Sequence, residues 1–160
     1  MGSDRTGEAL SNTEIMFRML SLVAMLLCLS TACKKHTVDD LPTTQLHFGS
    51  GGGFAGAYTA YVLLENGQCF KKESLNGTYQ AIGKTKKSAA KALFSQWETA
   101  KLGAMDFKHP GNLYYFVAME VEGQTHRLSW GASGHPAADQ LKAFYQACNA
   151  IIPQEKSISN

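Results

Sequence analysis

The chain has 160 residues, a formal net charge of +2 and a hydrophobic content of 44%. The length fits one domain of ordinary size, and the hydrophobic content is typical of a globular protein. The charge is too small to indicate a nucleic-acid partner, and the lysines at residues 84–91 have no aromatic side chains among them. We interpret these lysines as the solvated start of a helix rather than as a phosphate-binding site.

The N-terminal region predicts export and lipid attachment. Residues 19–29 are almost entirely apolar and follow Arg18, a combination typical of a signal peptide and too short to span a bilayer. Small residues and then Cys33 come next, in the order Leu-Ser-Thr-Ala-Cys. This order resembles the lipobox of bacterial lipoproteins, in which cleavage precedes a cysteine whose sulfur carries a diacylglycerol. Ser30 departs from the Leu or Val of the strongest lipoboxes, and an ordinary secretory signal is the alternative.

The signal peptide divides the chain into an exported domain and its flanking segments. Residues 1–14 are polar and do not fit a signal peptide, so Met16 is one candidate start and an expression tag is the other explanation. We expect a lipid-anchored protein of the bacterial cell envelope, attached to the outer membrane. The expected segments are an N-terminal extension with the signal peptide (1–32), a tether (33–44), one domain (45–153) and a polar tail (154–160).

The first part of the domain predicts strands joined by short turns. Alternating apolar and polar residues, many of them β-branched or aromatic, indicate strands at residues 45–49, 57–64 and 68–73. Asn66 and Gly67 suit a tight turn in which both residues have positive φ. A second turn leads to a short fourth strand at residues 78–82.

Two helices and a hairpin follow. Apolar residues recur at helical spacing from Ala90 to Ala100, with Thr85 as the expected N-cap and Gly103 as the residue that ends the helix. The last helix has Pro136 in its first turn and an apolar stripe that ends before Pro153. Between the helices, two further strands form a hairpin, at residues 113–121 and 124–130.

These elements predict an α+β domain. Hairpins imply antiparallel pairing, and two amphipathic helices need one sheet face to cover. We therefore expect an antiparallel sheet of about five strands with both helices on one face, in the order strands, helix, hairpin, helix. The expected shared core contains Leu93, Phe94, Trp97, Trp130 and Phe144.

A glycine-rich stretch at residues 48–56 separates the first two strands, and it reads FGSGGGFAG. Glycine loses more conformational freedom on folding than other residues, so three consecutive glycines carry an entropic cost that some structural or functional role must offset. One interpretation is that the bare backbone enters a protein cleft, with Phe54 as an aromatic anchor. The other is packing, with Gly53 and Gly56 at positive φ and Phe54 turned inward. The expected binding residues are Ser50, Gly51, Gly52, Gly53 and Phe54.

The remaining patterns predict no enzyme, no cofactor and no metal site. The glycines run into a strand rather than a helix, which argues against a phosphate loop. Ser50 and His47 lie on opposite faces of a strand, so they do not form a nucleophile and base pair. The histidines and cysteines lack metal-ligand spacing. Cys69 and Cys148 either form a disulfide in an oxidising compartment or stay as two separate buried thiols.

Residues 52–56, GGFAG, resemble the Ser-Gly-Gly-Phe-Ala-Gly signature near the start of emfourin-type proteins. These are small bacterial inhibitors of thermolysin-like metallopeptidases, with an α+β fold of similar size. Gly51 stands where that family has serine, and Ser50 is displaced by one position. Together with the lipobox, the motif is similar to exported lipoproteins of the Bacteroidetes type. The resemblance implies a partner that is a secreted metallopeptidase or another envelope protein. The alternative is a structural or accessory envelope lipoprotein.

We predict that Cys33→Ser abolishes lipid attachment. Without the sulfur that carries the diacylglycerol, the variant should leave the membrane fraction and accumulate as a longer, uncleaved precursor. Membrane fractionation and the mass of the protein test this prediction. A variant that stays with the membranes at the parental mass would contradict it.

Overall fold

The structure is a computed structural model that describes residues 35–154. The predicted signal peptide, Cys33 and the tail after residue 154 lie outside the described residues. Nothing in this part of the chain therefore bears on lipid attachment.

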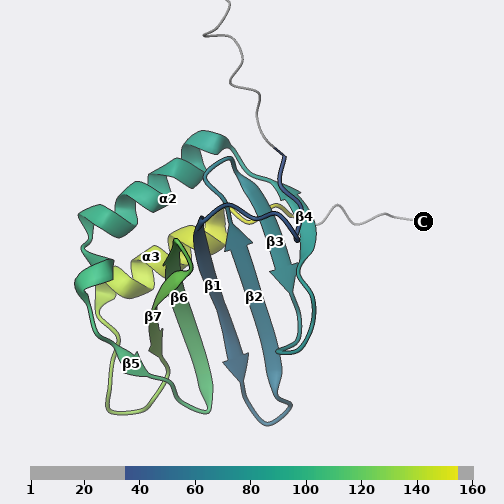
Figure 1. Ribbon diagram of the computed structural model, residues 1–160. Helices are drawn as coiled ribbons and strands as arrows, with labels where there is room; N and C mark the ends of the chain where they lie inside the picture. Colours follow the sequence, from purple (N-terminus) through teal and green to yellow (C-terminus); the bar gives the residue numbers. More distant parts are fainter. Residues whose placement is uncertain (1–34, 155–160) are drawn as a thin grey trace, which may run out of the picture. The chain divides into compact units, whose positions relative to one another are not determined.

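A seven-stranded sheet forms the centre of the domain, with strand order β4-β3-β2-β1-β6-β7-β5 (Figure 1). Every neighbouring pair is antiparallel except β5 and β7, which are parallel. The strands are β1 (Thr44–Gly52), β2 (Ala57–Leu63), β3 (Gln68–Lys72), β4 (Gln80–Lys84), β5 (Lys108–His109), β6 (Leu113–Val121) and β7 (Gln124–Trp130).

Both helices cover the same face of this sheet (Figure 1). They are α2 (Lys87–Thr99) and α3 (Asp139–Ala150), and a short 3-10 helix, η2 (Leu102–Ala104), follows α2. Alternate residues of the strands point toward them, because side chains alternate between the faces of a sheet. The main core consists of these residues and the apolar stripes of the helices. It includes all five predicted core residues, Leu93, Phe94, Trp97, Trp130 and Phe144.

The predicted α+β class and the order strands, helix, hairpin, helix are confirmed. The prediction of about five antiparallel strands is wrong, because the sheet has seven strands and is mixed. The parallel strand β5 is only two residues long, so it has no alternation that a sequence pattern could reveal. The strand predicted at residues 78–82 lies two residues later, at β4.

The first strand is longer than predicted. It continues through the glycines to Gly52, although glycine is depleted in strands. Pairing on both sides explains the difference, since β1 bonds to β2 along one edge and to β6 along the other. The loop between β1 and β2 therefore shrinks to residues 53–56.

The ends of the helices also differ from the predictions. Lys86, not Thr85, is the N-cap of α2, and no side chain caps the helix there. The Thr85 backbone N–H instead donates to Gly67 O at 2.9 Å. Lys101, not Gly103, takes the left-handed conformation after α2, with φ of 52°, and this places Leu102 in the core. The last helix begins at Asp139, so Pro136 precedes it rather than lying in its first turn.

The β2–β3 turn has only one residue at positive φ, not two. Gly67 has φ of 87°, whereas Asn66 keeps an ordinary conformation. The Asn66 side chain accepts a hydrogen bond from the Gln68 backbone N–H at 2.9 Å. Asparagine thus closes this turn with its side chain rather than with its backbone.

The segment before β1 is bound to the sheet. The Gln68 amide exchanges two hydrogen bonds with the backbone of His36, at 2.7 and 2.9 Å. Leu41 packs against a smaller cluster on the other face of the sheet, formed by Val62, Leu64 and Phe70. The described part of the predicted tether is therefore not a free spacer.

Cys69 and Cys148 are free thiols, and both are buried in the main core. Of the two alternatives, the structure has separate thiols rather than a disulfide. Burial raises the pKa of the Cys69 thiol to about 12 and raises that of Cys148 as well. The thiolate is the reactive form of cysteine, and a raised pKa keeps both side chains protonated. Both thiols are therefore poorly reactive.

We predict that Trp97→Ala is among the most destabilising substitutions in the domain. Trp97 is 2% exposed, and its ring contacts Phe144 edge-to-face with centroids 5.8 Å apart. Removing it should lower the free energy of unfolding by about 3–5 kcal/mol, as a cavity replaces the ring. Denaturant unfolding measures this change. Lys91→Ala, on the exposed side of the same helix, is the control, and equal stabilities of the two variants would contradict the packing of α2.

Candidate functional site

The turn between β1 and β2 is a compact, exposed hairpin tip. Gly52 pairs with Ala57, and residues 53–56 form the turn between them. The Gly56 N–H donates to Gly53 O at 3.1 Å, and the Gly53 N–H donates to Asn112 O at 2.7 Å. The second bond fixes the base of the turn to the segment before β6, so the tip projects from a rigid support.

Phe54 occupies the tip of this turn and has a relative exposure of 108%. Its ring therefore has no contact with the core. Leu113, which pairs with Gly52, is 50% exposed, and so an additional apolar side chain lies beside the base of the turn. The packing interpretation required Phe54 to turn inward, and the exposed ring instead favours the binding interpretation.

The glycines of the motif divide into two groups according to the space around them. A Cβ atom on Gly49 or Gly52 would lie 2.1 Å from Thr59 O or 1.8 Å from Asn112 O, respectively, so neither position accepts a side chain. At Gly53 and Gly56, by contrast, a Cβ atom would meet nothing within 4 Å. The first group packs within the sheet, and the second group shapes the exposed turn, where φ is 77° and 61°.

Gly49 and Gly51 also let aromatic rings meet across β1, on the face away from the helices. Tyr58 of β2 stacks on Phe116 of β6, with ring centroids 6.3 Å apart and an angle of 19°. A Cβ atom on Gly51 would lie 2.6 Å from the Tyr114 hydroxyl and 3.0 Å from the Tyr58 ring. A side chain on β1 would therefore separate these rings.

Cations cover this aromatic row. The Arg127 guanidinium carbon lies 3.7 Å from the centroid of the Phe116 ring. Lys72 Nζ lies 5.5 Å from the Tyr58 ring and 5.1 Å from the Tyr79 ring. Such contacts contribute about 0.5–1 kcal/mol each at exposed sites. The face without helices is thus covered by its own side chains.

The predicted binding residues do not all lie in the turn. Ser50, Gly51 and Gly52 belong to β1, whose backbone pairs with strands on both sides, so it has no free edge for an added strand. Ser50 faces the helices and contacts the Tyr145 side chain. Only Gly53 and Phe54 of the predicted set lie in the turn, and Leu113 was missed because its neighbour in the sheet is remote in the sequence.

The titratable groups near the motif do not form a catalytic centre. His47 lies on the face away from the helices, with Nε2 3.4 Å from Glu120 Oε2. Burial lowers the pKa of His47, although the Glu120 carboxylate opposes this shift. Ser50 lies on the other face, as predicted. Within residues 35–154, no group of three or more histidine, cysteine or acidic side chains could hold a metal ion.

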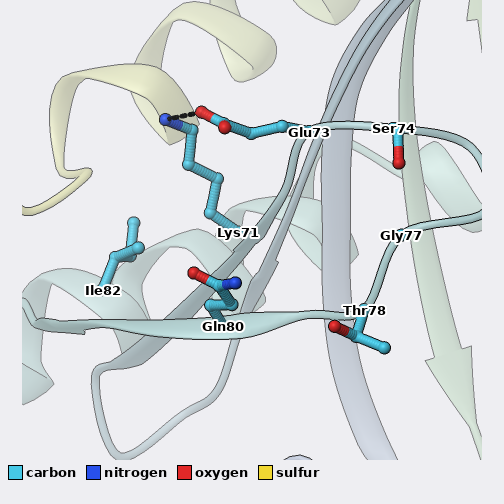
Figure 2. Close-up of a pocket in the computed structure, with 7 residues that line it drawn as sticks. All are labelled: Lys71, Glu73, Ser74, Gly77, Thr78, Gln80 and Ile82. Atoms are coloured by element: carbon cyan, nitrogen blue, oxygen red, sulfur yellow. Dashed lines mark ion pairs between the residues drawn. The ribbon is translucent and has the colours of Figure 1, made fainter.

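A polar hollow of about 330 Å³ lies beside β3 and β4. Figure 2 shows its Lys71 and Glu73 side chains paired, with Nζ and Oε1 2.6 Å apart. Ser74 and Thr78 supply hydroxyls on its rim, and Ile82 is its apolar side chain. No histidine lines the hollow to activate either hydroxyl, so this arrangement indicates no nucleophilic chemistry.

Comparison with known proteins found no protein-family model and no curated protein that matches this chain. The resemblance of residues 52–56 to the emfourin-type signature therefore stays a prediction. In the described part of the chain, neither helix has the length and hydropathy needed to cross a bilayer.

We predict that Gly52→Ala and Gly53→Ala differ sharply in stability, although both glycines have positive φ, at 93° and 77°. Left-handed backbone costs a non-glycine residue about 1–2 kcal/mol at either position. At Gly52 the Cβ atom also meets Asn112 O, which should add about 1–3 kcal/mol as overpacking. Denaturant unfolding of both variants tests this difference. If the two variants lost the same unfolding free energy, the Gly52 backbone would not be confined by Asn112.

Proposed function

We propose that this domain is a protein-binding module of the cell envelope whose contact surface is the β1–β2 turn, with Phe54 as its anchor. The observation that carries the proposal is the full exposure of Phe54 on a turn whose base is hydrogen-bonded to Asn112. A large exposed aromatic ring loses apolar hydration when it enters a pocket, and rigid aromatic side chains bind at low entropic cost. Leu113 extends the apolar surface beside it.

The arrangement of the sheet supports display of this turn. The described chain begins beside Gln68, at the end of the sheet opposite the β1–β2 turn (Figure 1). The nine residues of β1 separate the two ends by about 30 Å, at roughly 3.3 Å per residue. The β1–β2 turn therefore lies at the far end of the sheet from the point where the described chain begins. Lipidation at Cys33, in the outer membrane, is part of the proposal.

The partner class that the motif supports is a secreted metallopeptidase, because residues 52–56 resemble the signature of emfourin-type inhibitors. In this proposal the turn occupies the peptidase cleft and Phe54 fills an apolar pocket. The extended glycine backbone cannot lie along the partner as an added strand, since β1 is paired on both sides. Side-chain insertion at Phe54 is therefore the proposed contact, and the domain itself performs no catalysis.

One observation favours a second candidate function, a structural or accessory envelope lipoprotein. Gly49, Gly51 and Gly52 are explained by packing within the sheet alone. Packing does not explain Phe54, however, because a fully exposed phenylalanine contributes nothing to the core. The binding module is therefore the better supported of the two.

We predict that Phe54→Ala weakens partner binding by at least tenfold without changing stability. A hot-spot aromatic contributes about 2 kcal/mol or more to an interface, whereas an exposed side chain contributes within about 0.5 kcal/mol to folding. Inhibition of several thermolysin-like peptidases by micromolar domain is the first measurement, and unfolding free energy is the second.

Leu75→Ala is the matched control, because Leu75 is also an exposed apolar residue, at 67%, on a different turn. It should leave inhibition unchanged. Absence of inhibition by the parent domain across those peptidases would remove the inhibitor proposal. Equal inhibition by the Phe54→Ala variant and the parent would remove Phe54 as the anchor.

A further inference from the structure

Two histidines that are remote in the sequence meet at the β5 edge of the sheet (Figure 1). His109 is the last residue of β5, and His135 lies in the segment between β7 and α3. Their imidazole rings are stacked, with centroids 4.0 Å apart and planes within 3° of parallel. We call them the His109–His135 pair. Their spacing along the chain does not indicate this contact, because it depends on the pairing of β5 with β7.

The backbone holds both histidines in place through one residue, Ala132. The Ala132 N–H donates to His109 O at 3.0 Å, and the Ala132 carbonyl accepts from the His135 N–H at 3.3 Å. The start of β5 is fixed as well, because the Ser129 N–H donates to Phe107 O at 2.8 Å. Two side chains whose backbones are already held together lose less conformational entropy when they bind one ligand.

One ring of the pair is sheltered and the other is open to solvent. His109 is half-buried and contacts Phe107 edge-to-face, with centroids 4.9 Å apart, whereas His135 is exposed. Within residues 35–154, the histidines whose rings form a hydrogen bond or an ion pair are His36 and His47. The imidazole nitrogens of the His109–His135 pair are therefore available to a ligand.

The pair offers two nitrogen ligands to a metal ion. Within the described residues no group of three or more histidine, cysteine or acidic side chains could hold a metal, so water would fill the remaining positions around an ion. The acidic residue nearest to His109 in the sequence, Asp106, pairs instead with Lys108, with Oδ1 and Nζ 3.5 Å apart. Imidazole suits zinc, copper and nickel, whereas magnesium and calcium prefer oxygen ligands. The ligand type therefore selects for transition metals.

The spacing of the two rings is close to what one ion requires. Zinc–nitrogen bonds of about 2.0–2.1 Å in a tetrahedral arrangement place two donor nitrogens roughly 3.3 Å apart. The ring centroids of the pair are 4.0 Å apart. Because His135 is exposed, its ring can tilt until one nitrogen from each imidazole reaches the same ion.

We propose that the His109–His135 pair binds one divalent transition-metal ion of the zinc and copper class. One nitrogen from each imidazole ligates the ion, and water completes its coordination. The ion connects β5 to the segment before α3, which the structure otherwise links through Ala132 and the ring stack. The site uses no residue of the β1–β2 turn, so this proposal does not depend on the function of that turn.

The test is a titration of the full-length chain, first treated with a chelator, with Zn²⁺. The histidine ring signals in NMR spectra locate the ion, and calorimetry gives its affinity. We expect saturable shifts of the His109 and His135 ring signals that fit one ion per chain. Mg²⁺ at the same concentrations should shift neither signal, because it prefers oxygen ligands.

Three variants separate metal binding from packing of the rings. His109→Phe and His135→Phe each keep an aromatic ring in the stack and remove its nitrogens. Each should weaken zinc binding at this site by about tenfold or more, while the metal-free spectra keep the dispersion of the folded parent. His36→Phe is the matched control, because the His36 ring bonds to Asp40 O rather than to a second imidazole. It should leave the affinity unchanged.

Loss of the zinc-induced shifts in both ring variants, with the shifts retained in His36→Phe, would support the metal site. The absence of saturable shifts of the His109 and His135 signals in the parent would overturn the proposal. So would zinc affinities at this site that His109→Phe and His135→Phe leave equal to that of the parent. Either of these two results would assign the pair to packing of the segment before α3 alone.

Discussion

The central position of β1 is the constraint on which the rest of this domain depends. β1 is paired with β6 from Thr44 to Gly52 along one edge and with β2 from Leu46 to Gly52 along the other. On the helix side it contributes Leu46 and Phe48, which are almost completely buried in the main core. On the opposite side its second half contributes Gly49 and Gly51, because the rings of Tyr58 and Phe116 meet above this part of its backbone. The strand therefore carries core side chains on one face and, in its glycine half, no side chains on the other.

This constraint assigns different roles to the residues of one short motif. Gly49, Gly51 and Gly52 are confined by atoms of β2 and of the chain at the start of β6. After Gly52 the chain leaves the sheet, and the same motif supplies an open turn with Phe54 at its tip. The bond from the Gly53 N–H to Asn112 O connects the two parts. The motif thus combines a backbone that is hydrogen-bonded at the base of the turn with an exposed aromatic ring, an arrangement that suits recognition of a protein pocket.

The two ends of the sheet carry different chemistry. The end with the β1–β2 turn presents Phe54 and Leu113, which are apolar and uncharged. The opposite end carries a hollow between α2 and β6, which the side chains of Glu98 and Glu122 line. Between them, the helix-free face is covered by the cations Lys72 and Arg127 over aromatic rings.

The sequence by itself determined the elements that have strong local periodicity. The apolar stripes of α2 and α3 and the alternation of β7 predicted the shared core of Trp97, Trp130 and Phe144, because side-chain spacing along a helix or strand is a local property. It also identified Phe54 as the candidate anchor, since an aromatic residue among glycines is unusual wherever it occurs.

Only the tertiary structure decided how far β1 extends, which glycines are confined and where the pockets lie. Gly51 is confined by Tyr114, and Gly52 by Asn112, both of which follow α2 in the chain. The two-residue strand β5 exists because β7 offers it an edge. A hollow of about 510 Å³ is lined by α2 and by the β6–β7 hairpin, which comes later in the sequence. Each of these features depends on atoms that meet only after the sheet has formed, and a local pattern contains no information about such contacts.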